Sequence, residues 1–245
     1  MNLKLTEKMK LDFYLKKKTK LFAQFKENLN IAKDLLLKKF DQNKVASLLN
    51  MMEEEYEKIL PQAQYIGGNT NPFTSFITGA VEMFSMMRVL EKEGVTFREI
   101  GEFSFEYNEK SNEIREESLK KVGQTHSEQI FTPSYLKFMK ETAKTSQERK
   151  FPGDWVFEFI DGKDEPFTYG YDFTQCGVNE LAKRIGMEKY MPFMCLADFT
   201  EATAAGFGFI RTQTLGNGAP LCDHRYIKGG TTPRAWPPEK IQEFK

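Results

Sequence analysis

The chain has 245 residues, of which 40% are hydrophobic and 29% are charged, and its formal net charge is zero. This composition is ordinary for a globular protein, and the length allows one large domain or two small ones. A neutral chain excludes a global attraction to nucleic acid or to anionic membranes. No apolar run approaches the roughly 18 residues that a membrane-spanning helix needs.

The N-terminal part of the chain has the apolar periodicity of amphipathic helices, which we expect over residues 7–39 and 44–59. Residues 1–40 contain eleven lysines and four acidic residues. We favour a solvated helix face for these lysines, and a surface for a nucleic acid or an anionic membrane is the alternative. The charged start has no apolar segment of the secretory kind, so we expect a cytoplasmic protein with reduced thiols.

Glycines and prolines mark the boundaries of the next helices. Pro61 ends the second helix, and the stretch YIGGNTNPF separates it from a third helix over residues 72–93, which Gly94 closes. A short fourth helix is expected directly after Gly94. Residues 108–121 and the segments on both sides of Pro133 are also expected to be helical.

The pattern changes at Phe151, where apolar and polar residues alternate. FPGDWVFEFIDG and EPFTYGYDF are expected to form an antiparallel pair of strands. A helix in VNELAKRIG, stopped by Gly186, and a helical CLADFTEATAAG come next. Two further strands, FGFIRTQT and LCDHRYI, flank a GNG turn. The segment TTPRAWPPEKIQEFK is expected to be extended or loosely docked.

These elements predict an α+β fold, with a helical N-terminal region followed by an antiparallel sheet with packed helices in the order β-β-α-α-β-β. We expect N-terminal amphipathic helices over residues 1–60, an α+β domain over residues 61–230 and a proline-rich tail over residues 231–245.

All three cysteines lie in the last third of the chain, each a few residues from an aspartate. Cys176 is expected at a helix start, where the helix dipole lowers the pKa of a thiol and prepares a nucleophile. The alternative is a buried small apolar residue. Cys195 and Asp198 are three residues apart, which places both on one helix face. There the carboxylate can move a proton while the thiol attacks, or the pair can bind a cation.

Two further groups near the cysteines are candidates for a site. Cys222 and His224 alternate along an expected strand and therefore share a face, as a thiol with its base or as a packed pair. Arg211 shares its strand face with aromatic residues, and a buried guanidinium needs a carboxylate partner. Asp198 or Asp223 can supply that carboxylate, or a substrate can.

The sequence gives little support for a metal or a nucleotide. The cysteines are separated by 18 and 26 residues, without the CxxC pair typical of structural zinc sites. A site made in space by three thiolates with an aspartate or a histidine stays open. Glycine-rich phosphate loops and the GxSxG motif are missing from the sequence, so we expect no cofactor and no metal.

Three segments resemble the L-2-amino-thiazoline-4-carboxylic acid hydrolase family: YDFTQCGVNELAKRIG, MPFMCLADF and GFGFIRTQTLGNGAPLCDHRY. They contain a cysteine before a helix, a Pro-x-x-Cys-x-x-Asp element, Arg-Thr-x-Thr-Leu, a glycine, and Cys-Asp-x-Arg before an aromatic residue. The matching residues are Cys176, Pro192, Cys195, Asp198, Arg211, Thr212, Thr214, Leu215, Gly218, Cys222, Asp223, Arg225 and Tyr226. His224 departs from the pattern, which has an aromatic residue there. The segment NPFTSFITGAVEMF is also similar to the family, and the resemblance covers residues 65–227.

The resemblance implies a hydrolase that opens a C–N bond of a small cyclic amidine or amide, such as a 2-amino-thiazoline carboxylate. Water adds at the C=N carbon, and the ring opens to a carbamoyl-cysteine. The expected catalytic residues are Cys176, Cys195, Asp198, Cys222 and His224. The expected substrate-binding residues are Arg211, as the clamp of the substrate carboxylate, with Asn71, Thr74, Thr212 and Asp223.

A more distant likeness to the ligand-binding domains named after 4-vinyl reductase implies the alternative, a non-catalytic small-molecule sensor or carrier. In either case the expected partner is a small molecule, and for the hydrolase it carries a carboxylate. We expect neither nucleic acid nor membrane as a partner, and homo-oligomerisation stays open.

Overall fold

The structure is a computed structural model that describes residues 13–244, so the start of the first expected helix lies outside the described residues. Contacts divide the chain into two units. Unit 1 comprises Met1–Tyr107, Phe151–Asp154 and Gly177–Glu188, and unit 2 comprises Asn108–Lys150, Trp155–Cys176 and Lys189–Lys245. The expected division at residues 60 and 230 stays a prediction.

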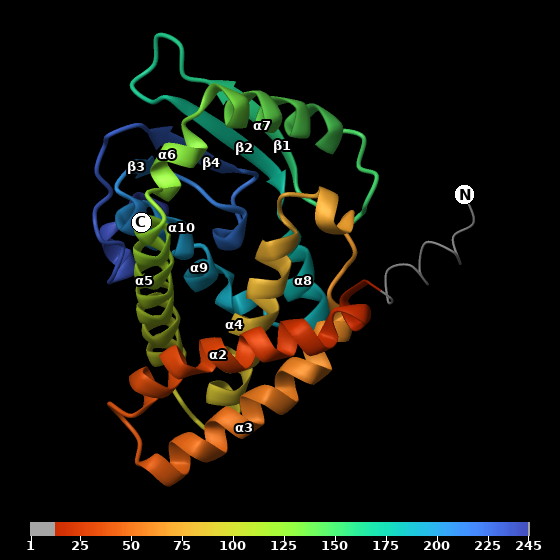
Figure 1. The fold of residues 1–245 in the computed structure, drawn as a ribbon, viewed down its shortest axis with the longest axis vertical. Helices are drawn as coiled ribbons and strands as arrows, with labels where there is room; N and C mark the ends of the chain where they lie inside the picture. The colour runs from red at the N-terminus through yellow and green to blue at the C-terminus, as the bar shows by residue number, and fades with distance from the viewer. Residues whose placement is uncertain (1–12, 245) are drawn as a thin grey trace, which may run out of the picture. The chain divides into compact units, whose positions relative to one another are not determined.

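Unit 1 is built from helices. They are α2 (Lys18–Leu36), α3 (Gln42–Ile59), α4 (Thr74–Lys92), the first part of α5 (Phe97–Lys121) and α8 (Gly177–Ile185), with the short 3-10 helices η1 (Leu60–Gln62) and η2 (Gly68–Thr70). Helix α3 packs against α2 and α4, and α4 packs against α8 (Figure 1). The fully buried rings of Phe25 and Tyr56 stack with their centroids 4.4 Å apart in this core. Gly94, at φ 79°, follows α4, which confirms the predicted end of that helix.

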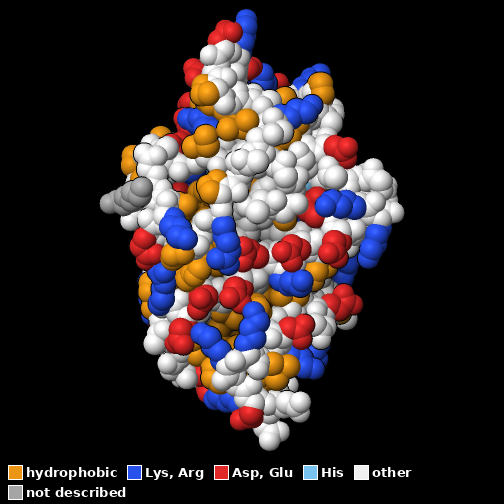
Figure 2. All heavy atoms as spheres, turned by 90° about the vertical axis from the view of Figure 1, so that its left-hand side faces the viewer, with side chains coloured by type: hydrophobic (Ala, Val, Ile, Leu, Met, Phe, Trp, Pro, Cys, Tyr) orange, Lys and Arg blue, Asp and Glu red, His pale blue; other side chains and the backbone are white. Residues whose placement is uncertain are grey.

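The lysines of α2 face carboxylates of the same unit. Lys18 pairs with Glu57 and Lys26 pairs with Glu53, each at 2.8 Å. Figure 2 shows the same mixture on one face of the molecule, where Lys and Arg side chains alternate with Asp and Glu. These pairings favour the solvated helix face over a surface of one sign.

Helix α5 is a single helix of 25 residues, so the short fourth helix and the separate helix over 108–121 were wrong as two elements. Its start is fixed by a capping box, in which the Thr96 hydroxyl accepts from the Glu99 amide and the Glu99 carboxylate accepts from the Thr96 amide. This cap gives hydrogen-bond partners to two amides at the helix start, which stabilises the beginning of the helix at Phe97. The helix continues through the charged residues 108–121.

Unit 2 contains an antiparallel sheet. Its elements are α6 (His126–Ile130), α7 (Pro133–Ser146), β1 (Val156–Asp161), β2 (Tyr169–Gln175), α9 (Met191–Met194), α10 (Ala197–Ala205), β3 (Gly208–Ile210), η4 (Leu215–Asn217), β4 (Cys222–Ile227), η5 (Pro238–Lys240) and η6 (Gln242–Phe244). The 3-10 helix η3 (Glu188–Tyr190) lies at the division between the units. The strand order is β1-β2-β4-β3. Helix α7 packs against β1 (Figure 1), and α10 packs against β3. The α+β class is therefore confirmed, although three helices rather than two lie between β2 and β3.

One face of this sheet is aromatic and buried. Tyr169 of β2 lies opposite Tyr226 of β4, and their rings stack 4.7 Å apart. His224 lies on the same face, with the rings of Phe173 and Phe209 at 5.0 and 5.1 Å. Cys222 and His224 are both buried while the residue between them is half-buried, which confirms that they share a face.

The last segments differ from expectation in two ways: one strand is shorter than expected, and of the two states expected for the tail, extended or loosely docked, the second is wrong. The strand FGFIRTQT ends at Ile210, because the Asp223 carboxylate, rather than a neighbouring strand, accepts the amides of Thr212 and Gln213 at 2.8 and 2.9 Å. The proline-rich tail is not loosely docked, since Trp236 and Ile241 are 8% and 7% exposed. The tail therefore belongs to the core of unit 2.

Candidate functional site

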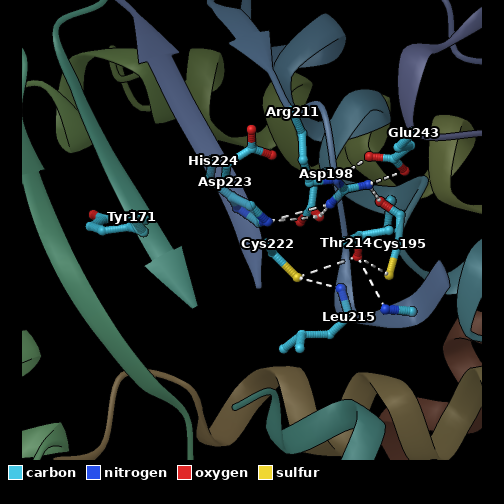
Figure 3. Close-up of polar contacts among 12 residues, drawn as sticks. Tyr171, Cys195, Asp198, Arg211, Thr214, Leu215, Cys222, Asp223, His224 and Glu243 are labelled. Carbon is cyan, nitrogen blue, oxygen red and sulfur yellow. Dashed lines mark hydrogen bonds and ion pairs between the residues drawn. The ribbon is translucent and has the colours of Figure 1, made fainter. Parts of the chain in front are cut away.

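Two of the three thiols meet at one hydroxyl group. Cys195 directly follows α9 and Cys222 begins β4, and the buried Thr214 lies between them (Figure 3). The Thr214 hydroxyl donates to the Cys195 sulfur at 3.4 Å and lies 3.3 Å from the Cys222 sulfur. A threonine has one hydroxyl proton to donate, so the Cys222 thiol donates to Thr214. The three groups form a chain of hydrogen bonds from Cys222 to Cys195.

Backbone amides complete this arrangement. The Leu215 amide donates to the Cys222 sulfur at 3.2 Å, and the Gly216 amide donates to the Thr214 hydroxyl at 3.3 Å. Gly216 also leaves room for a thiol, because a Cβ atom there would lie 2.7 Å from the Cys195 sulfur. The short helix η4 therefore holds both sulfurs in place. We did not expect a role for Thr214, although it lies in the Arg-Thr-x-Thr-Leu motif.

The third thiol, Cys176, directly precedes α8, as predicted, and is half-buried. Negative charge on Cys176 contributes to raising the pKa of Cys195, so it lies within electrostatic reach of the other two thiols. Its assignment as the nucleophile stays a prediction.

Arg211 is the centre of a buried ion network (Figure 3). Its guanidinium donates to Asp198 at 2.5 Å, to the Cys195 carbonyl at 2.8 Å, and to both carboxylate oxygens of Glu243 at 2.5 and 2.8 Å. The His224 Nε2 atom lies 3.4 Å from the guanidinium. A guanidinium has five N–H donors, and these contacts use all five. Its carboxylate partners are thus Asp198 and Glu243.

Asp223, the other carboxylate considered for Arg211, holds the backbone instead. Besides the amides of Thr212 and Gln213, it accepts the Thr212 hydroxyl. These bonds fix the turn that carries Arg211 and Thr214. A substrate-binding role of Thr212 and Asp223 stays a prediction. Glu243 was missed because its segment was expected to be extended or loosely docked, which gives no contact with Arg211.

Burial controls the protonation of these groups. It raises the pKa of the Cys195 thiol against the opposing attraction of Arg211, and it also raises the pKa of Cys222. Burial likewise raises the pKa of the Asp198 carboxyl to about 6, again against Arg211. Near neutral pH, the two thiols are therefore protonated and Asp198 is mostly ionised.

His224 is neutral, because burial and then the charges of Arg211 and Arg225 hold its pKa well below the ordinary value. A guanidinium only donates, so the nitrogen facing Arg211 is the acceptor and Nδ1 carries the proton. Nδ1 lies 3.4 Å from the Tyr226 hydroxyl. No hydrogen bond joins His224 to a thiol within residues 13–244, and its role as a base stays a prediction.

Asn71 and Thr74 belong to unit 1, whereas the thiols belong to unit 2. The Asn71 side chain donates to the Ile66 carbonyl and accepts from the Phe73 amide. The Thr74 hydroxyl donates to the Gly68 carbonyl at 2.6 Å. Both side chains fix the turn before α4, and a role in substrate binding stays a prediction.

A surface groove of about 620 Å³ lies in unit 2, between α7 and β1. None of the thiols lines it; its walls include Lys140 and Lys144 of α7 and Phe157 and Phe159 of β1. Across residues 13–244 we find no cluster of three His, Cys, Asp or Glu side chains arranged for a metal ion. In the same part of the chain, no helix has the length and apolarity to traverse a bilayer.

The comparisons with known proteins give one match. The model of the family described as L-2-amino-thiazoline-4-carboxylic acid hydrolase matches residues 75–226. No curated protein and no solved structure matches the chain. The matched segment contains the three cysteines, Asp198, Arg211 and Thr214, and it ends before the tail that carries Glu243.

Proposed function

Because the chain belongs to the L-2-amino-thiazoline-4-carboxylic acid hydrolase family, we propose that it hydrolyses a C–N bond of a small cyclic amidine bearing a carboxylate. A 2-amino-thiazoline carboxylate is the first candidate substrate. The observation that carries the proposal is the pair of thiols bound to the Thr214 hydroxyl, with the Asp198 carboxylate near them. Asp198 and the Cys195 carbonyl both accept hydrogen bonds from Arg211. In this arrangement Asp198 can act as a base and the hydrogen-bonded thiols can act as proton donors to one small substrate.

In the proposed reaction, Asp198 is the general base. Its side chain is one-third exposed, at 33%, so solvent reaches the carboxylate, while Arg211 fixes its orientation. Asp198 takes a proton from water as the water oxygen adds to the C=N carbon. An ionised carboxylate with a raised pKa is suited to this task at neutral pH.

The thiols act as proton donors, since burial keeps them protonated. Cys195 gives its proton to the ring nitrogen as the water oxygen adds, and it regains a proton from Cys222 through the Thr214 hydroxyl. Asp198 passes the proton that it took from water to the same nitrogen, which becomes a free amine as the C–N bond breaks. The hydroxyl of the adduct loses its proton as the carbonyl forms, and this proton returns to Cys222 through solvent. For 2-amino-thiazoline-4-carboxylate, ring substrate plus water gives S-carbamoyl-cysteine, with a free amine. Cys176, at the start of α8, stays the candidate for an alternative route by nucleophilic attack.

The test is product analysis by mass spectrometry after incubation with 2-amino-thiazoline-4-carboxylate. We expect S-carbamoyl-cysteine, recognised by its free amine and by the absence of a new free thiol. D198N should lose the activity. D172N is the matched control, because Asp172 is also a paired carboxylate of unit 2, bound to Arg225 at 2.7 Å. A new free thiol would show C–S cleavage instead, and reversible binding without product would favour the sensor.

A further inference from the structure

The tail of the chain presents a carboxylate to Arg211 in the way that a ligand would. Both oxygens of Glu243 accept from one edge of the guanidinium, formed by Nε and Nη2, at 2.5 and 2.8 Å. The Glu243 side chain is 0% exposed. A two-point contact of this kind is the usual way in which arginine binds a free carboxylate.

The network holds one carboxylate more than it has cations. Arg211 is the cation, Asp198 and Glu243 are its two carboxylates, and the adjacent His224 is neutral. Buried charge without a full partner is costly. Glu243 accordingly contributes to the raised pKa of Asp198. Departure of Glu243 would leave Asp198 as the one carboxylate of this network paired with Arg211, with the charges balanced.

The contacts of the tail show which part can leave. Trp236 and Ile241 are buried and anchor the segment, whereas Gln242 is exposed. Residues 242–244 form η6, whose contacts include the ion pair of Glu243, a hydrogen bond from Asn217 to the Glu243 carbonyl at 2.8 Å and a bond from the Phe244 amide to the Ile241 carbonyl at 3.3 Å. Residues 242–244 can therefore detach while Ile241 stays in place.

We propose that the Nε–Nη2 edge of Arg211 is a binding site for a small carboxylate, which Glu243 occupies in this structure, and that the ligand displaces residues 242–244. The inference rests on the proposed function only in taking the carboxylate-bearing substrate as the ligand. Glu243 lowers the apparent affinity for such a ligand, because the ligand can bind only to the fraction of molecules in which Glu243 has left the Nε–Nη2 edge of Arg211.

Two measurements test this site. The first is the affinity for 2-amino-thiazoline-4-carboxylate by calorimetry, with 2-amino-thiazoline as the probe that lacks the carboxylate. E243Q, and a chain ending at Ile241, should bind the carboxylate about tenfold more tightly than the unchanged protein, a difference of ~1.4 kcal/mol. E239Q is the matched control, since Glu239 is an exposed acid of the same tail, and its affinity should not change.

The second measurement follows the tail by digestion of the 245-residue chain with carboxypeptidase Y and mass spectrometry. The carboxylate probe should speed removal of Phe244 and Glu243 severalfold, and 2-amino-thiazoline should not. Thermal unfolding of each variant shows whether it is folded.

The site is refuted if E243Q and the shortened chain bind the carboxylate no better than the unchanged protein, or not at all. A digestion rate that the carboxylate leaves unchanged refutes the displacement. If the protein nevertheless hydrolyses the substrate, the proposed hydrolase activity is supported and only the proposed displacement of Glu243 is rejected. Tighter binding and faster digestion without turnover would instead support the carboxylate site and reject the hydrolase.

Discussion

At the scale of single residues, Thr214 provides the shared hydrogen-bond partner of the half-buried Cys195 thiol and the buried Cys222 thiol. Each sulfur is in a surrounding that raises its pKa, so neither is a ready thiolate. The hydroxyl between them gives each thiol a polar partner without adding charge. A single threonine thereby joins two cysteines, far apart in sequence, in one chain of hydrogen bonds, along which the proposed proton transfer runs.

T214V tests this unit, because valine keeps the shape of threonine and removes the hydroxyl. The Cys222 thiol and the Gly216 amide would lose their acceptor, and the proton path between the sulfurs would be cut. We expect kcat/KM to fall by about 100-fold, the lower end for a lost proton-transfer group. T214S, which restores the hydroxyl, should recover most of the activity. Equal rates for T214V and T214S would contradict the path.

The pH dependence of the reaction tests Asp198. Burial raises the pKa of its carboxyl to about 6, and a general base must be ionised to act. The value of kcat/KM should therefore rise with pH and level off above about pH 7. D198N should remove this dependence and lower the rate by roughly 100-fold or more. A rise near pH 6 that persists in D198N would assign the titration to another group, whereas D172N should retain the profile.

At the scale of elements, the sequence pattern predicted helices and strands correctly where the residues of the element itself determine its conformation. The alternation in β1 and β2 and the glycine ends of α4 and α8 were correct for this reason. The end of β3 could not be predicted from its own residues. Alternation continues past Ile210, but the Asp223 side chain takes the amides that a sheet would pair. The element boundary is therefore set by a residue more than ten positions away.

Gly216 in η4 gives a prediction at this scale. A Cβ at this position would meet the Cys195 sulfur at 2.7 Å and the Met191 backbone at 3.3 Å. G216A should lower the free energy of unfolding by about 1–3 kcal/mol, as overpacking does, and should displace the Cys195 sulfur. Urea denaturation measures the cost. G79A is the matched control, because a Cβ on Gly79 of α4 meets nothing within 4 Å and alanine favours a helix.

A double substitution separates the clash with sulfur from the clash with the backbone. In a C195A background, the nearest atom that the new Cβ would meet is gone, so G216A should cost less there than in the unchanged protein. An equal cost in both backgrounds would mean that Met191, rather than the thiol, requires glycine at this position.

At the scale of the whole chain, the candidate site is built from segments that lie far apart in the sequence, and each segment was predicted without reference to the others. The fold class could be predicted from the element pattern, and Asp198 was one of the partners expected for Arg211, because both residues lie in recognisable motifs. Glu243 could not, since a proline-rich segment carries no periodicity that says where it docks. Arg211 connects these parts by binding groups that extend in sequence from Cys195 to Glu243.

R211K tests how far this connection supports the fold. Lysine keeps the positive charge, but it has three donors on one atom and cannot reach Asp198, Glu243 and the Cys195 carbonyl together. At least one buried acceptor would lose its partner, so we expect the free energy of unfolding to fall by about 1–3 kcal/mol in urea denaturation at pH 7. R225K is the matched control, because Arg225 is partly exposed and its pair with Asp172 should contribute about 1 kcal/mol or less. If R211K unfolds at the same urea concentration as the unchanged protein while its affinity for the carboxylate falls, Arg211 serves the ligand rather than the fold. A loss of both is expected here, since the same guanidinium joins the segments of unit 2 and offers the edge that Glu243 occupies.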